Sequence, residues 1–156
     1  MGLNIGDKAP GFKLYSSEKE EIALDNFAGK NVVLLFFPQA FTGVCTTELC
    51  SVRDGIADYN HLNAEVLAIS VDSIFTLARF KEDQALNFRL LSDFNKEISA
   101  AYGALYEEFV FGMHGVSKRA AFVVDGTGHI QYAEVLESAG DLPSFSAIKE
   151  ALAGLN

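Results

Sequence analysis

The stretch NVVLLFFP, Asn31 to Pro38, is the part of the sequence that decides the fold. Its central residues are all apolar and either branched or aromatic, which is typical of a strand buried on both faces. Pro38 ends this strand because proline has no backbone N–H to donate to a neighbouring strand. Similar runs follow at 65–71 and 120–124, so the pattern predicts at least three buried strands.

Helical patterns alternate with these strands. Leu49, Val52 and Ile56 are spaced three and four residues apart, which predicts one helix over about 45–62. Further helices are expected at 73–86, 94–102 and 144–152, a hairpin over 120–135, and a small hairpin in the first 25 residues. Strands alternating with helices predict an α/β sandwich in which helices flank a central mixed sheet.

Length, composition and charge narrow the function further. The chain has 156 residues, of which 49% are hydrophobic and 21% charged, so we expect one domain spanning 1–156. A formal net charge of −9 disfavours binding to nucleic acid or to an anionic membrane. The sequence has no signal peptide and no apolar run as long as a membrane span, and only two cysteines, which together indicate a cytoplasmic protein.

Both cysteines, Cys45 and Cys50, lie shortly after the first buried strand. Sites in α/β folds form at the carboxyl ends of central strands, so this position favours a functional role. Cys45 would lie in the first turn of the following helix, where unpaired N–H groups and the helix dipole favour a thiolate. By position alone, Cys45 fits a nucleophile and a small buried hydrophobic residue equally well.

The residues before Cys45 change that balance. Thr42 is placed where its hydroxyl can reach a group at the sulfur, or where it simply caps the helix. Pro38 either shields the sulfur from water or merely ends the strand. Together they give the pattern Pro38-x-x-x-Thr42-x-x-Cys45, which resembles the active-site signature of the peroxiredoxins, the alkyl hydroperoxide reductase/thiol-specific antioxidant superfamily.

The resemblance extends over nearly the whole chain. Matching segments occur in the family's order at 6–12, 66–72, 91–93 with 101–103, and 119–125. The resemblance implies a thioredoxin-like fold and an antioxidant thiol peroxidase that reduces hydrogen peroxide and organic hydroperoxides. The expected reaction needs no cofactor and no metal, and it passes through a thiolate and a sulfenic acid.

Individual roles follow from the resemblance. Cys45 would be the peroxidatic nucleophile, and Thr42 and Arg119 would position the peroxide and stabilise developing charge. The backbone N–H of Val44 would add a donor at the helix entry. Glu48 would orient Arg119, or it would be a solvated glutamate favoured by the helix dipole.

The role of Cys50 stays open. On an intact helix its Cα lies about 8.7 Å from that of Cys45, beyond the roughly 7 Å that a disulfide allows, so bridging needs local unwinding. The spacing Cys-x-x-x-x-Cys resembles the bacterioferritin-comigratory branch, in which the second cysteine resolves the first. The stretch FTGVC, 41–45, instead resembles one-cysteine branches, so Cys50 is either a resolving cysteine or a silent thiol.

The expected partners are a hydroperoxide, a second copy in a homodimer, and a thiol reductant of the thioredoxin, glutaredoxin or low-molecular-weight type. Among rival enzymes, a dithiol exchanger would need Cys-x-x-Cys, which is absent, and no histidine has metal-ligand spacing to the cysteines. A Cys–His hydrolase using His114 stays open. A peroxide sensor or holdase would share the first chemical step, and only turnover distinguishes it from an enzyme.

Overall fold

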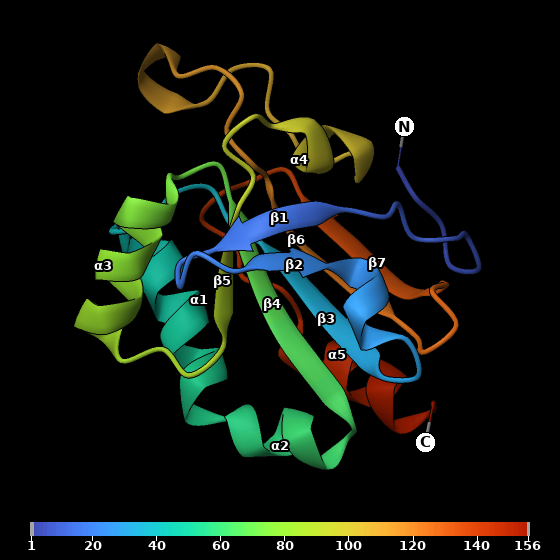
Figure 1. The fold of residues 1–156 in the computed structure, drawn as a ribbon. Coiled ribbons are helices and arrows are strands. Elements are labelled where there is room, and N and C mark those ends of the chain that lie inside the picture. The colour runs from blue at the N-terminus through green and yellow to red at the C-terminus, as the bar shows by residue number, and fades with distance from the viewer. Residues whose placement is uncertain (1, 156) are drawn as a thin grey trace.

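A mixed sheet of seven strands forms the centre of this computed structural model, which describes residues 2–155 (Figure 1). The order across the sheet is β2-β1-β5-β4-β3-β6-β7, with β3, β4 and β5 parallel and the other neighbours antiparallel. The strands are β1 (Lys13–Ser16), β2 (Glu21–Ala23), β3 (Asn31–Phe36), β4 (Ala64–Ser70), β5 (Arg89–Ser92), β6 (Arg119–Val124) and β7 (Ile130–Leu136).

Helices lie on both faces of this sheet, which confirms the predicted α/β class. The α-helices are α1 (Gly43–Asp54), α2 (Ile56–His61), α3 (Ile74–Gln84), α4 (Glu97–Ala101) and α5 (Phe145–Ala153), and the 3-10 turns are η1 (Leu24–Phe27) and η2 (Val110–Gly112). Ser73 and Ser144 cap α3 and α5 by accepting from the N–H groups of Thr76 and Ala147. None of the helices within 2–155 is long and apolar enough to cross a membrane.

Strand β3 is buried along its whole length, as its sequence predicts. Val33 and Leu35 face a core that also contains residues of α1, α3 and α5. Leu34 and Phe36 face a second core, formed with the N-terminal segment and with Tyr102 beside α4. Each such side chain contributes about 1.5–3 kcal/mol through burial, so β3 fixes both layers to one sheet.

Two expectations about the helices were wrong in detail, and one strand was missed. The single helix expected over 45–62 is interrupted at Gly55, which has non-helical angles and whose N–H bonds to the carbonyls of Ser51 and Val52. Strand β5 was not expected, because a run of two buried residues is too short for a periodic signal. Helix α4 begins only after Lys96, which adopts a left-handed conformation that the expected span 94–102 would not allow.

The sheet register determines which residues meet at the end of β3. Phe36, the last residue of β3, is paired with Ala120, the second residue of antiparallel β6. Arg119, at the start of β6, therefore lies at the sheet edge where β3 ends and the chain turns into α1. Two segments separated by more than seventy residues in the sequence thus meet at one place.

Candidate active site

Cys45 is the third residue of α1 and lies at the carboxyl end of β3. Its side chain is 1% exposed, and its sulfur accepts hydrogen bonds from both terminal nitrogens of Arg119, each at 3.4 Å. A guanidinium that faces a sulfur with two donors can also hold an oxyanion that forms beside that sulfur. This arrangement is what a nucleophilic cysteine needs, and a merely buried cysteine would not require it.

Arg119 is shared among three acceptors. Besides the sulfur, Nη1 donates to Glu48 Oε1 at 2.6 Å, and Nη2 donates to the carbonyl oxygen of Ala139 at 2.8 Å. Burial acts to lower the pKa of Arg119, but the charges of Glu48 and Cys45 more than offset it, so the pKa is raised. Arg119 thus remains a fixed positive charge beside the sulfur.

Glu48 is fully buried, so the alternative of a solvated first-turn glutamate does not hold. Burial raises the pKa of Glu48 to about 7, although the charge and hydrogen bond of Arg119 oppose that rise. Within the described residues, Glu48 Oε2 and Arg119 Nε have no hydrogen-bond partner, which adds to the cost of keeping the carboxylate charged. Glu48 therefore titrates near neutral pH rather than in the acidic range.

This raised pKa gives Glu48 a definite effect on stability. The folded state holds the proton of Glu48 more tightly than the unfolded state does, so binding of this proton stabilises the fold. This contribution to the free energy of unfolding is complete below the unfolded pKa and is lost as pH rises through about 7. A shift from 4.5 to about 7 corresponds to about 3 kcal/mol at roughly 1.4 kcal/mol per pKa unit. Urea unfolding of wild type and Glu48→Gln should show wild type losing up to this amount, relative to the variant, between about pH 5 and pH 8. If the difference in unfolding free energy between wild type and Glu48→Gln were the same at pH 5 and at pH 8, the raised pKa would be contradicted.

Thr42 occupies the position before α1, with an extended backbone, but its side chain does not cap the helix. Its hydroxyl instead donates to the carbonyl oxygen of Gln39 at 2.7 Å, which leaves the oxygen lone pairs available to accept. The same loop is held by Asp72, whose Oδ2 accepts from the N–H of Ala40 at 2.8 Å. Asp72 was not predicted as a site residue, although its place two residues after the parallel strand β4 is a signal for one.

A pocket of about 470 Å³ opens over these residues. Its lining includes five of the predicted site residues, Pro38, Thr42, Val44, Cys45 and Arg119. Two predicted residues do not line it: Cys50, and Glu48, which contacts Arg119 instead. The remaining lining residues were not predicted from sequence, and half of them come from the loop at 109–113: Gln39, Gly43, Phe109, Val110, Phe111, Met113, Ala139 and Gly140.

Comparison with known proteins decides the family. The model of the AhpC/TSA family matches residues 5–133, which is most of the chain. This chain belongs to the AhpC/TSA family and is a peroxiredoxin. Alkyl hydroperoxide reductase E of Mycobacterium tuberculosis is 36% identical over 156 residues, covering 98% of each chain. The mitochondrial thioredoxin-dependent peroxide reductase of Bos taurus is 38% identical over 158 residues, covering 95% of this chain and 58% of that protein.

Solved structures agree with this assignment. The AhpC of Mycobacterium tuberculosis superposes with a TM-score of 0.84 at 26% identity, covering 99% of this chain and 94% of that one. The thioredoxin-like fold expected from the resemblance is thereby confirmed for this peroxiredoxin. Within residues 2–155, no group of three or more His, Cys, Asp and Glu side chains is arranged to hold a metal ion.

Cys50 lies outside the pocket of this peroxiredoxin. It is half-buried on the intact helix α1, and its thiol donates to Gln84 Oε1 at 3.4 Å, at the end of α3. Both cysteines are free. Five helical residues rotate a side chain by about 140°, so the two sulfurs leave α1 in different directions.

Proposed function

We propose that this peroxiredoxin is a thiol-dependent peroxidase that reduces hydrogen peroxide and organic hydroperoxides at Cys45. The observation that carries the proposal is the sulfur of Cys45, held by two donors of a charged Arg119 at the base of an open pocket. The names of the relatives, an alkyl hydroperoxide reductase and a thioredoxin-dependent peroxide reductase, support the same reaction class.

In the first step, the Cys45 thiolate attacks the terminal oxygen of ROOH, which carries the hydrogen. A sulfur–oxygen bond forms as the oxygen–oxygen bond breaks, giving Cys45–SOH and RO⁻, which takes a proton to become ROH. Sulfur, attacked oxygen and leaving oxygen must lie in line, so the pocket has to hold the peroxide end-on to the sulfur.

The surrounding residues have distinct roles in this step. Arg119 turns from the thiolate toward the leaving oxygen as negative charge moves there, and Glu48 keeps the guanidinium in plane with the sulfur. Thr42 accepts a hydrogen bond from the peroxide OH, since its own proton is directed to Gln39. Pro38 excludes water from one side of the sulfur, and the N–H of Val44 is a further donor at the helix entry.

The sulfenic acid must then be reduced by a thiol. Either Cys50 attacks it, giving a Cys45–Cys50 disulfide and water, or an external thiol does so. We propose that Cys50 resolves, since local unwinding of the first turn of α1 would free the Cys45 sulfur to reach Cys50.

Intact mass after one equivalent of hydroperoxide should show the fate of the sulfenic acid. Resolution by Cys50 predicts a loss of about 2 Da in wild type, whereas Cys50→Ser should gain about 16 Da and be trapped by dimedone. A gain of about 16 Da in wild type as well would assign resolution to an external thiol and leave Cys50 silent.

Four further properties are proposed on the family resemblance and composition. The chain acts as a single domain, as a homodimer and in the cytoplasm. Its reductant is a thioredoxin, a glutaredoxin or a low-molecular-weight thiol. Sedimentation velocity of the reduced protein tests the dimer, and steady-state assays with each class of reductant test the choice of reductant.

Turnover distinguishes the enzyme from a peroxide sensor. With excess thiol reductant, the proposal predicts that peroxide consumption continues far beyond one equivalent of protein. Consumption that stops at one equivalent with a thioredoxin, a glutaredoxin and a small thiol alike would favour a sensor or holdase instead.

A further inference from the structure

The carboxylate of Asp72 reaches from the end of β4 to the loop at 37–42, which leads from β3 into α1. Strands β3 and β4 are parallel neighbours, so their carboxyl ends lie side by side. Oδ2 of Asp72 accepts from the N–H of Ala40 at 2.8 Å. Asp72 does not line the pocket over Cys45, so any effect it has on the chemistry passes through this loop.

The sheet holds Asp72 in place from its own side. Ser70, the last residue of β4, is fully buried, and its hydroxyl donates to Asp72 Oδ2 at 2.7 Å and accepts from the N–H of Asp72 at 3.2 Å. The hydroxyl of Ser92, the last residue of β5, donates to the carbonyl oxygen of Asp72. The ends of two strands therefore fix Asp72, which makes its carboxylate a rigid support for the loop.

The loop adopts a conformation that its own sequence does not favour. Phe41 has φ 66°, in the left-handed region, which is unfavourable for an aromatic residue. Ala40 is 8% exposed, so its N–H needs an acceptor within the protein. Asp72 supplies a charged acceptor, and hydrogen bonds to charged oxygens are stronger than those between neutral groups. A contact from outside the loop thus sets the shape of the loop.

This contact reaches Thr42 through a single peptide group. The N–H of Ala40 and the carbonyl of Gln39 belong to the same planar peptide group. The N–H side donates to Asp72, and the carbonyl side accepts from the hydroxyl of Thr42 at 2.7 Å. Fixing the plane of this group therefore fixes the direction of the Thr42 proton. The negative charge of Asp72 also polarises the group, which makes its carbonyl oxygen the better acceptor.

We propose that Asp72 is a positioning residue for the peroxide. It holds the peptide group between Gln39 and Ala40 so that the oxygen of Thr42 presents its lone pairs to the peroxide OH. The inference rests on the proposed function, because this orientation matters to a rate only if Cys45 attacks a peroxide.

The nucleophile is held by different contacts. Both terminal nitrogens of Arg119 donate to the sulfur of Cys45, and Arg119 is bound in turn to Glu48. None of these hydrogen bonds involves Asp72. Two reactions of the same sulfur therefore separate the roles: oxidation by hydrogen peroxide depends on an OH held by Thr42, whereas alkylation by iodoacetamide does not.

Single-turnover rates of Cys45 with hydrogen peroxide and with iodoacetamide test the inference. Asp72→Ala should lower the oxidation rate by about 10- to 100-fold, the effect expected when a reacting group is misplaced, and leave the alkylation rate unchanged. Asp72→Asn keeps an oxygen that can accept from the N–H of Ala40, so it should restore most of the oxidation rate. Asp72→Ser, whose side chain is too short to reach that N–H, replaces the alanine variant if the latter does not fold.

A double-mutant cycle tests whether Asp72 acts through Thr42. Thr42→Val removes the hydroxyl that the peptide group orients. In that background, Asp72→Ala should lower the oxidation rate little further, because the two changes remove the same contact to the peroxide.

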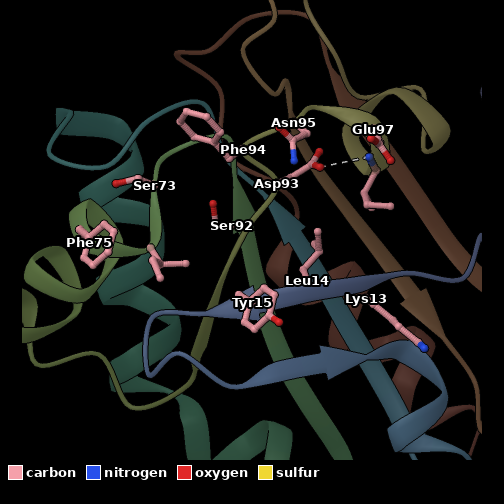
Figure 2. A pocket seen from close by; sticks show the side chains of 12 residues that line it. Lys13, Leu14, Tyr15, Ser73, Phe75, Ser92, Asp93, Phe94, Asn95 and Glu97 are labelled. Atoms are coloured by element: carbon pink, nitrogen blue, oxygen red, sulfur yellow. Dashed lines mark hydrogen bonds between the residues drawn. The ribbon is translucent and has the colours of Figure 1, made fainter.

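The matched control is Asp93→Ala. Asp93 directly follows β5, but its carboxylate supports α4 by accepting from the N–H of Ile98 at 3.2 Å (Figure 2) and from that of Ser99 at 2.6 Å. The variant therefore removes a carboxylate at the end of a neighbouring strand without touching the loop at 37–42. Its folded fraction should be oxidised at the wild-type rate.

Three outcomes would overturn the inference while leaving the peroxidase in place. One is a wild-type oxidation rate in both Asp72→Ala and Asp72→Ser. Another is a fall in oxidation and alkylation by the same factor, which would mean that Asp72 only stabilises the loop. The third is a cycle in which the effects of Asp72→Ala and Thr42→Val simply multiply. If peroxide leaves wild-type Cys45 unoxidised while iodoacetamide alkylates it, the proposed function itself fails.

Discussion

Replacing Cys45 by serine is expected to reduce hydroperoxide consumption to the uncatalysed background. The serine hydroxyl is nearly isosteric and should still accept hydrogen bonds from Arg119, but it is not an anion at neutral pH and cannot cleave the O–O bond. The loss would therefore be one of chemistry rather than of structure. A coupled assay of peroxide loss with excess thiol, alongside thermal unfolding, measures both.

Cys50→Ser is the matched control for this variant, because it removes a thiol from the same helix without touching the pocket. Its first oxidation by peroxide should proceed at the wild-type rate, even if later turnover slows. Substantial turnover by Cys45→Ser, or loss of the first oxidation in Cys50→Ser, would contradict the assignment of Cys45 as the nucleophile.

Arg119→Ala is expected to lower the rate of Cys45 oxidation by about 10²–10³-fold, equivalent to roughly 3–4 kcal/mol. That is the usual cost of removing a donor to a developing oxyanion, and Arg119 also holds the attacking thiolate. Arg119→Lys keeps the charge but loses the two-pronged geometry, so its rate should be intermediate. Single-turnover rates by stopped flow provide the measurement.

Folding must be separated from chemistry in this variant. Removing Arg119 leaves Glu48 buried without its cation, which costs about 3–5 kcal/mol of stability if the carboxylate stays charged. Rates are therefore compared for the folded fraction, with the double variant Glu48→Gln/Arg119→Ala to remove the buried charge. Arg79→Ala, at a residue whose side chain is 71% exposed in an ion pair on α3, controls for loss of a surface arginine. A rate within threefold of wild type in the double variant would contradict the proposed role of Arg119.

The central sheet was predictable because β3 carries its own signal. An unbroken run of branched and aromatic residues specifies a strand covered on both faces, and the structure buries every residue of it. The place of Cys45 in the first turn of a helix was predictable for a related reason, since the carboxyl end of such a strand leads into the N-terminus of a helix. Strand β5 gave no such signal, because only Leu90 and Leu91 are buried in it.

The pairing of Arg119 with Cys45 is a different kind of prediction. Nothing local to Arg119 indicates that it faces the sulfur, since that contact depends on β6 lying antiparallel to β3. The position was identified only through resemblance to a family. Sequence also left Glu48 open between solvent and burial, because a glutamate in a first helical turn is favourable in both settings.

The sequence did not indicate that the apolar residues Phe109, Val110, Phe111 and Met113 line the pocket over Cys45. These residues form no periodic pattern, and loops are expected on the surface, so a run such as FVFGM, 109–113, gives no indication of which cavity it borders. The place of this run beside Cys45 depends on the long connection between α4 and β6, which folds back over the loop before α1. Such tertiary placement of a loop is encoded by contacts such as that of Gln39 with Met113 rather than by local propensity.

The most direct test is to map, by peptide mass spectrometry, where one equivalent of hydroperoxide oxidises the wild-type protein at neutral pH in the presence of dimedone. The account predicts that oxidation is found on the peptide containing Cys45, as a dimedone adduct or as a disulfide with Cys50. Recovery of an unmodified Cys45 that alkylates like a fully reduced thiol, with oxygen found on Cys50 or on methionine, would contradict it.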